Sequence, residues 1–237
     1  DRGAGRRGRR SRRRGRRAGR VGAAARRGRR EGLSASRPAR VPFVGLTGGL
    51  GAGKSTALAA LERLGAATLS TDAVVHELYA GDEVRDAVVA RWGAEVAPGG
   101  VVDRAAIARA AFASPDERAW LEGLLWPRVG ARVAAWRDGL DGSDPPPRAA
   151  VVETPLLFEA GLEGGYDATI AVIADEEVRA ARAAQRGHHA VDERAARQLG
   201  QQEKAARATY VVANSGTIAD LELALAAVLD KLDPESP

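Results

Sequence analysis

The sequence predicts an α/β fold in which five short strands form one parallel sheet. Two observations predict it: short apolar runs alternate with helical patterns, and a glycine-rich loop joins the first run to the first helix. The 237 residues are 45% hydrophobic, which suffices for a core of ordinary size. We therefore expect one globular domain, formed by residues 41–237.

Charge is divided unevenly along the chain. Residues 1–40 hold 17 of the 36 basic side chains but only two acids, Asp1 and Glu31, although the whole chain carries a net charge of only +5. The remainder of the chain is therefore acidic. The basic tail has almost no apolar residues, so burial cannot offset its ordering entropy, and we expect it to be disordered.

Three interpretations of this tail stay open. A targeting peptide would need a longer apolar stretch than residues 21–25. A nucleic-acid-binding arm would act through counterion release by its arginines, but the tail offers no aromatic side chain for base stacking. The third interpretation, which the composition favours, is an extension that the folded domain does not need. Nucleic acid is therefore not expected as a partner, except through the tail.

Composition also excludes several classes of protein. The chain has no Cys, which excludes disulfides, thiolate metal sites and cysteine nucleophiles. No apolar run approaches the roughly 18 residues that a membrane-spanning helix needs, so no membrane partner is expected. We expect a cytoplasmic protein. Three histidines lack metal-ligand spacing and receive no ligand role: His76, His188 and His189.

The first strand, residues 41–47, leads into a loop with the pattern G-x-x-x-x-G-K-[ST], and a helix over residues 55–64 follows. In this pattern the glycines let backbone N–H groups turn inward around phosphates, and the helix N-terminus adds positive charge. Lys54 would reach the β- and γ-phosphates, and the Ser55 hydroxyl would hold Mg²⁺. A chance glycine-rich turn is disfavoured by the strand before it and the helix after it. The residues predicted to bind ATP here are Gly51, Ala52, Gly53, Lys54, Ser55 and Thr56.

A second strand, residues 67–71, is followed at once by Asp72. The carboxyl ends of parallel strands face the ligand crevice, so Asp72 could accept the proton of an attacking hydroxyl. It could equally cap the helix that follows. The residues alone leave both roles open.

A third strand, residues 148–153, ends in Glu153, and the apolar loop 154–162 follows. Glu153 could hold Mg²⁺ through water, and the loop could form an apolar wall for a phosphoryl acceptor. Helix capping and core packing are the plain alternatives for these residues.

A fourth strand, residues 168–174, leads into a helix over residues 176–185, and then into a segment rich in arginine. An arginine-bearing lid could close over the phosphates, exclude water and clamp phosphoryl oxygens. Solvated arginines on a helix face are the alternative. The chain ends with a fifth strand at residues 209–213, the sequence Asn214-Ser-Gly216, and a helix over residues 218–232.

Together these motifs resemble the dephospho-coenzyme A kinase family. The resemblance covers residues 41–232, and the more specific of its motifs are Pro-Leu-Leu-Phe-Glu at 155–159 and Asn-Ser-Gly at 214–216. The other positions that carry it are residues 45–56, Asp72, residues 112–115, residues 121–127, Gln185 and Arg186.

The resemblance implies a P-loop NTPase fold, a three-layer sandwich with a five-stranded parallel sheet. It also implies a helical substrate-binding subdomain near residues 73–135 and a lid near residues 182–200. The implied reaction transfers the γ-phosphoryl group of ATP to the ribose 3′-hydroxyl of dephospho-CoA, with Mg²⁺. Asp72 would be the general base, Lys54 and Arg186 would stabilise the transferred group, and Asn214 would lie near adenine. The implied acceptor contacts are Asp72, Leu156, Leu157, Glu159, Arg104, Arg194 and Gln198.

The chain departs from the family pattern at three places. Trp126 stands where the family usually has His, Ala213 stands where it usually has Asp, and the lid is shorter than usual. Two other functions remain alternatives: a P-loop kinase for another small acceptor such as a nucleoside monophosphate, and a nucleic-acid-associated NTPase that uses the basic tail. A guanine-reading Asn-Lys-x-Asp motif is missing, because Asn214 is the only Asn and Ser follows it. The sequence indicates no oligomeric state.

Overall fold

The structure is a computed structural model, and it describes residues 40–185 and 198–233. The expectation of disorder for the basic tail lies outside these residues. Arg186, Arg194, His188, His189 and most of the expected lid lie outside them too.

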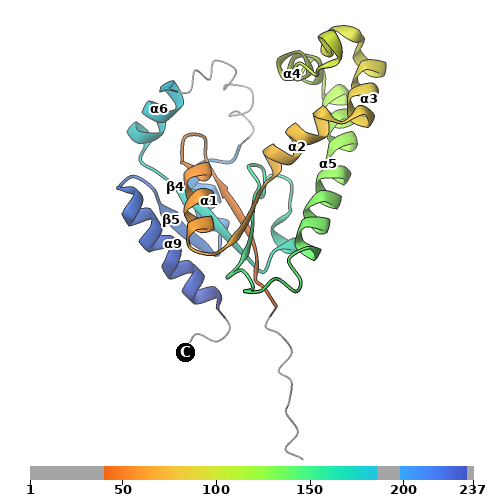
Figure 1. Ribbon diagram of the computed structural model, residues 1–237. Coiled ribbons are helices and arrows are strands. Elements are labelled where there is room, and N and C mark those ends of the chain that lie inside the picture. Colours follow the sequence, from red (N-terminus) through yellow and green to blue (C-terminus); the bar gives the residue numbers. More distant parts are fainter. Residues whose placement is uncertain (1–39, 186–197, 234–237) are drawn as a thin grey trace, which may run out of the picture. The chain divides into compact units, whose positions relative to one another are not determined.

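The centre of the described chain is a five-stranded parallel sheet, as the sequence predicted (Figure 1). Its strands follow the order β2-β3-β1-β4-β5, so β1 is central and its side chains are buried on both faces. Because all strands are parallel, their carboxyl ends lie at one edge. The strands are β1 (Phe43–Gly48), β2 (Ala67–Ser70), β3 (Ala150–Glu153), β4 (Ala168–Ile173) and β5 (Tyr210–Ala213).

One face of the sheet is covered by α1 (Lys54–Arg63) and α9 (Ile218–Leu232), which lie together in Figure 1. Leu61 of α1 and Leu225 of α9 are fully buried in the same apolar cluster as Val44 of β1. The start of α9 is defined by a capping box, in which Thr217 Oγ1 accepts from Asp220 N and Asp220 Oδ2 accepts from Thr217 N. This reciprocal cap explains why α9 begins where the sequence predicted.

The other face is covered by the second half of α5 (Pro115–Asp138) and by α8 (Gln201–Arg207). Val133 and Trp136 of α5 pack against a small cluster formed by Phe43, Ala150 and Val152. Helices on both faces of one sheet give three layers, which confirms the predicted sandwich.

A second group of helices has an apolar core of its own. It consists of α2 (Thr71–Ala80), α3 (Asp82–Trp92), α4 (Arg104–Ala111) and the first half of α5. Short 3₁₀ turns at Ala94–Val96 and Pro98–Gly100 join α3 to α4. Figure 1 shows α2 leading from the sheet to α3 and α4, which pack around α5. The core of this group contains Tyr79, Val84, Val88, Val96, Ala106, Ile107 and Leu125.

The remaining elements are the 3₁₀ turn Glu163–Gly165 and α6 (Glu176–Gln185), which follow β3 and β4. Within the described residues, no helix is both long enough and apolar enough to cross a membrane.

Candidate active site

The glycine-rich loop lies at the carboxyl edge of the sheet, between β1 and α1. Gly51 and Gly53 have φ values of 72° and 88°, in the left-handed region that disfavours other residues. A Cβ atom at Gly53 would lie 2.1 Å from Asn214 Nδ2, and one at Gly51 would lie 2.5 Å from the carbonyl oxygen of Arg179. Both glycines are therefore required by the backbone and by close packing against later segments.

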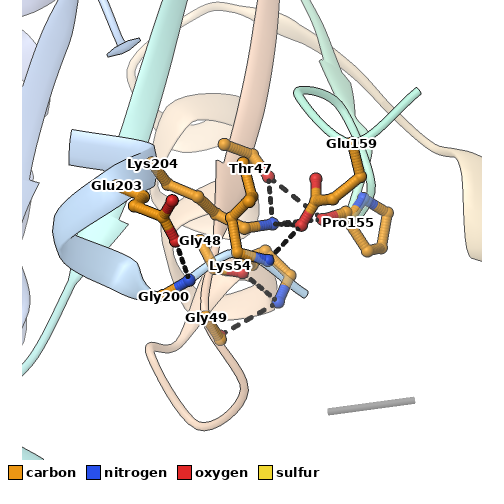
Figure 2. A network of polar contacts seen from close by, with 10 residues as sticks. Thr47, Gly48, Gly49, Lys54, Pro155, Glu159, Gly200, Glu203 and Lys204 are labelled. Carbon is orange, nitrogen blue, oxygen red and sulfur yellow. Dashed lines mark hydrogen bonds and ion pairs between the residues drawn. The ribbon is translucent and has the colours of Figure 1, made fainter. Parts of the chain in front are cut away.

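The predicted ATP-binding residues Lys54 and Ser55 lie at the junction of the loop and α1. Lys54 Nζ donates to the carbonyl oxygens of Gly48 and Gly49 at 3.1 and 3.2 Å, so the lysine curls back over the loop (Figure 2). Ser55 is exposed in the first turn of α1, where helix N–H groups also point. Ala52 and Gly53 are the buried residues at the end of the loop, directly before α1.

Asn214 joins the loop to β5. Asn214 is only 4% exposed, and its Nδ2 donates to Ala52 O at 2.8 Å. Its backbone N–H donates to Ile173 O at 2.8 Å, which continues the pairing of β4 with β5. The side chain thus supports the phosphate loop directly.

Two arginines of α6 also contact the loop region; the sequence placed both among the possible lid arginines and left solvated arginines as the alternative, without assigning either a site role. Arg179 Nε donates to Leu50 O at 2.9 Å, and Arg182 Nη1 donates to Asn214 O at 2.9 Å. Their spacing of three residues puts both on one face of α6, and this was the available signal. Because β4 and β5 flank β1 on one side, these contacts occupy that side of the loop.

Asp72 lies on the opposite side of β1, in the first turn of α2. The N-cap position belongs to Ser70, so the capping alternative for Asp72 does not describe this helix. The Asp72 side chain is exposed. Thr71 Oγ1 donates to Glu153 O at 3.0 Å, which ties the start of α2 to the end of β3. Asp72 therefore lies at the same sheet edge as the phosphate loop.

Glu153 ends β3 and is 7% exposed. Its Oε2 accepts from Ser70 Oγ at 2.6 Å, and in the sheet register it pairs with Leu46 on β1 and Ser70 on β2. Because β3 lies between β1 and β2, this buried carboxylate lies between the phosphate loop and Asp72, at the carboxyl edge of the sheet.

Two of the predicted acceptor residues, Leu156 and Leu157, are neighbours in the loop after β3 but differ in burial. Leu156 is 37% exposed, whereas Leu157 is fully buried, close to the Cα of Gly45. Leu157 therefore packs the loop after β3 against β1, and Leu156 offers apolar surface to solvent. Glu159 is engaged with Lys204 at 2.9 Å and with the backbone N–H of Leu199 at 2.8 Å.

The other predicted acceptor residues are dispersed. Arg104 is exposed in the first turn of α4, within the helical group. Gln198 is half-buried, and its Oε1 has no hydrogen-bond partner among the described residues.

Two positions that depart from the family pattern, Trp126 and Ala213, lie far apart in the sequence. Trp126 on α5 is 53% exposed. Ala213 lines a cavity of about 330 Å³ that flanks Asn214 at the ends of β4 and β5.

Lys204 is a site-region residue that sequence reasoning did not single out. It is fully buried and contacts Thr47, Pro155 and Glu159. In the sequence it is one lysine in a short polar stretch, which looks like a solvated helix face. No local signal distinguished it.

The fold and this site define a P-loop kinase. A phosphate loop at the central strand is flanked by arginines on one side and by a carboxylate on the other, at the carboxyl edge of a parallel sheet.

Comparison with known proteins identifies the family. A family model for dephospho-CoA kinase matches residues 42–220. The chain is 38% identical over 201 residues to a dephospho-CoA kinase from Deinococcus radiodurans, covering 84% of this chain and 96% of the relative. It is 35% identical over 199 residues to the dephospho-CoA kinase of Geobacter metallireducens, covering 82% and 98%. The chain belongs to the dephospho-CoA kinase family.

Solved structures agree with this fold. A crystal structure from Thermus thermophilus has a TM-score of 0.68 and 35% identity, and the match covers 82% of this chain and 99% of that one. A dephospho-CoA kinase structure from Campylobacter jejuni has a TM-score of 0.58 at 22% identity, covers 81% and 96%, and supports the fold alone.

Proposed function

We propose that this protein transfers the γ-phosphoryl group of ATP to the ribose 3′-hydroxyl of dephospho-CoA and so forms coenzyme A. The observation that carries the proposal is the placement of the phosphate loop and Asp72 at one sheet edge in a member of this kinase family.

The two substrates take opposite sides of the loop. Arg179, Arg182 and Asn214 approach the loop from β4 and β5, so ATP lies on that side with its phosphates over residues 51–56. The side of β3 and β2 is left for the acceptor, where Asp72 and the helical group α2 to α5 lie. Substrates on opposite sides of the loop support an in-line approach of the acceptor hydroxyl to the γ-phosphorus.

The chain's own residues supply the groups that the transfer needs. The acceptor oxygen bonds to the γ-phosphorus, the bond to the β–γ bridging oxygen breaks, and ADP leaves. The Asp72 carboxylate takes the hydroxyl proton. Lys54 stabilises charge on the β- and γ-phosphates, and Arg186, which lies outside the described residues, acts with it.

Mg²⁺ fits the residues at this edge. The exposed Ser55 hydroxyl would hold the ion directly, and Glu153 would hold it through water. Among residues 40–185 and 198–233, no group of three or more acidic or histidine side chains gathers as a metal site. Such a sparse donor set suits an ion that keeps its waters and binds mainly nucleotide oxygens. When bound, Mg²⁺ neutralises charge on the phosphates.

The acceptor is held by residues on the β3 side. Leu156 supplies exposed apolar surface, and Arg104 supplies a cation on the helical group. Gln198 contributes from the segment before α8, and Arg194, which lies outside the described residues, is expected from the sequence to act with it. Glu159 and Leu157 act on the acceptor through the loop that they stabilise. The cytoplasmic location expected from the sequence stays a prediction.

An acceptor-dependence assay tests the function. ADP release from Mg²⁺-ATP is measured with dephospho-CoA, with AMP, with CMP and with no acceptor. We expect strong stimulation by dephospho-CoA alone. Stimulation by AMP or CMP instead would identify a nucleoside monophosphate kinase, and no stimulation by dephospho-CoA would reject the assignment.

The role of Asp72 has its own test. Asp72→Asn should lower kcat by about 10²–10⁴-fold, the usual contribution of a general base, and leave ATP affinity unchanged. Asp116→Asn, which alters an exposed acid in the first turn of α5, is the matched control and should keep kcat. An Asp72→Asn enzyme with normal kcat would remove the proposed base.

A further inference from the structure

Lys204 carries a charge in a fully buried position. It lies on α8, and none of its surface is exposed. Its Nζ lies 2.9 Å from Glu159 Oε1, donates to Pro155 O at 2.6 Å, and lies 3.3 Å from Thr47 Oγ1 (Figure 2). The ammonium has three N–H donors, and three oxygens surround it.

The three acceptors belong to segments that border the reaction. Thr47 is the residue before Gly48, at the root of the phosphate loop. Pro155 and Glu159 lie in the loop after β3, on either side of the exposed Leu156. Thr47 Oγ1 also donates to Pro155 O at 3.3 Å. A single ammonium group thus joins the root of the phosphate loop to the loop that faces the acceptor.

Glu159 extends the connection to a further segment. Its Oε1 accepts from the backbone N–H of Leu199, at the point where the described chain resumes before α8. Its Oε2 is buried and has no hydrogen-bond partner among the described residues. The carboxylate oxygen Oε1 is therefore shared between the backbone N–H of Leu199 and Lys204.

A gain in the stability of the fold does not account for the buried pair of Lys204 and Glu159. Burial lowers the pKa of Lys204, and the hydrogen bond and charge of Glu159 only partly oppose this effect. Removing two charges from water is costly, and apolar residues of similar volume often stabilise a buried site at least as well. A buried ion pair does supply directional hydrogen bonds, which define one arrangement of the groups that it joins.

We propose that Lys204 and Glu159 are positioning residues of the kinase: they hold the acceptor loop, residues 154–159, against the end of β1, so that the acceptor is aligned with the phosphate loop. The proposal rests on the proposed function for its kinetic consequences. Neither residue touches the reacting atoms, so both act through Pro155, Leu156 and Thr47. Loss of the pair should impair use of the acceptor more than binding of ATP.

Three variants separate positioning from plain stability. Lys204→Met and Glu159→Leu each leave a buried polar group without its partner, so each should lower the Tm. The double variant removes both charges and should recover part of the Tm, although the Leu199 N–H and the Pro155 carbonyl still lose their side-chain partners. We expect its kcat with dephospho-CoA to stay about 10–100-fold low, because misplaced reactants lose rate steeply, with KM for ATP within about twofold of the wild type.

A milder variant covers the case in which the double variant does not fold. Glu159→Gln keeps an acceptor for Leu199 N and removes only the charge. It should lower kcat/KM for dephospho-CoA by about tenfold, equivalent to about 1.4 kcal/mol, and leave KM for ATP unchanged. Thr209→Val is the control: it removes the partly buried hydrogen bond from Thr169 N to Thr209 Oγ1, which lies away from both loops, and it should keep wild-type kinetics.

Hydrogen–deuterium exchange gives a readout that does not depend on the acceptor. In the folded variants, exchange at residues 154–162 should increase, and exchange in α9 should not. Recovery of both Tm and kcat in the double variant, or unchanged exchange and kinetics in Glu159→Gln, would overturn the proposal. If dephospho-CoA fails to stimulate the wild-type enzyme, the proposed function fails, and the exchange result still decides whether the pair holds the loop.

Discussion

Asn214 Nδ2 donates to the carbonyl oxygen of Ala52 at 2.8 Å, and this bond joins residues 162 positions apart in the chain. Asn214 directly follows β5, and Ala52 lies in the phosphate loop after β1. A buried amide thus links the end of the edge strand β5 to the predicted phosphate loop.

Removal of this amide should weaken ATP binding. Asn214→Leu leaves the buried Ala52 carbonyl without its donor, which costs about 1–3 kcal/mol of stability. Because the unpaired carbonyl lies in the phosphate loop, KM for ATP should rise several-fold. Asp167→Ala is the control: it removes the acceptor for Phe43 N at the opposite edge of the sheet, where the distance is 2.8 Å. It should lower stability and leave KM for ATP unchanged, and an equal rise in both variants would contradict the assignment.

Two glycines with nearly the same backbone angle provide a paired prediction. Gly53 has φ 88° and Gly142 has φ 87°, but a Cβ atom at Gly53 would lie 2.1 Å from Asn214 Nδ2, and one at Gly142 would meet nothing within 4 Å. Alanine at either position should cost about 1–2 kcal/mol in left-handed strain. Only Gly53→Ala must displace Asn214, so only it should raise KM for ATP, by at least about tenfold if binding loses about 1.4 kcal/mol. ATP titration and chemical denaturation of both variants measure the two effects separately.

Local patterns predicted the strands, the phosphate loop and the helices next to it, because each depends on neighbours in the sequence. The glycines at 51 and 53 are an example: the motif and the strand before it already require their positions. The helix 218–232 was also predicted at the observed bounds, from its amphipathic pattern after Asn214-Ser-Gly216, and the structure adds the Thr217 cap.

Contacts over long separations could not be predicted in this way. Lys204 lies on a helix of seven residues with polar neighbours, and its burial depends on Thr47, 157 positions earlier. The division between Leu156 and Leu157 likewise depends on which of two adjacent leucines meets Gly45. Neither the composition nor the periodicity of the loop distinguishes them.

Deletion of residues 1–39 tests the acidic core against the basic tail. The described site residues all lie in the core, so we expect kcat and KM for both substrates within about twofold of the full-length chain, a change of less than about 0.5 kcal/mol. Retention on a polyanion such as heparin should disappear, because counterion release needs the arginines of the tail. Steady-state kinetics and a salt gradient on heparin measure the two outcomes. A large loss of rate would show that the tail takes part in catalysis.

The free energy of unfolding at acid pH should depend on Glu117 of α5, whose carboxylate accepts hydrogen bonds from α3. It accepts from Arg91 Nη2 at 2.8 Å and from Trp92 Nε1 at 2.7 Å, and these hydrogen bonds lower the pKa of the carboxyl below its usual range. The unfolded chain therefore binds the proton more readily, and the stabilisation is present at neutral pH and lost as the pH falls through the lowered pKa. Glu117→Gln should be less stable than the wild type at pH 7, and the difference should shrink below about pH 4. Chemical denaturation between these pH values measures it. Glu122→Gln, which removes a partly exposed ion pair with Arg118 at 3.6 Å on the same helix, should change stability little at pH 7. A constant difference between Glu117→Gln and the wild type across this range would contradict the assigned role.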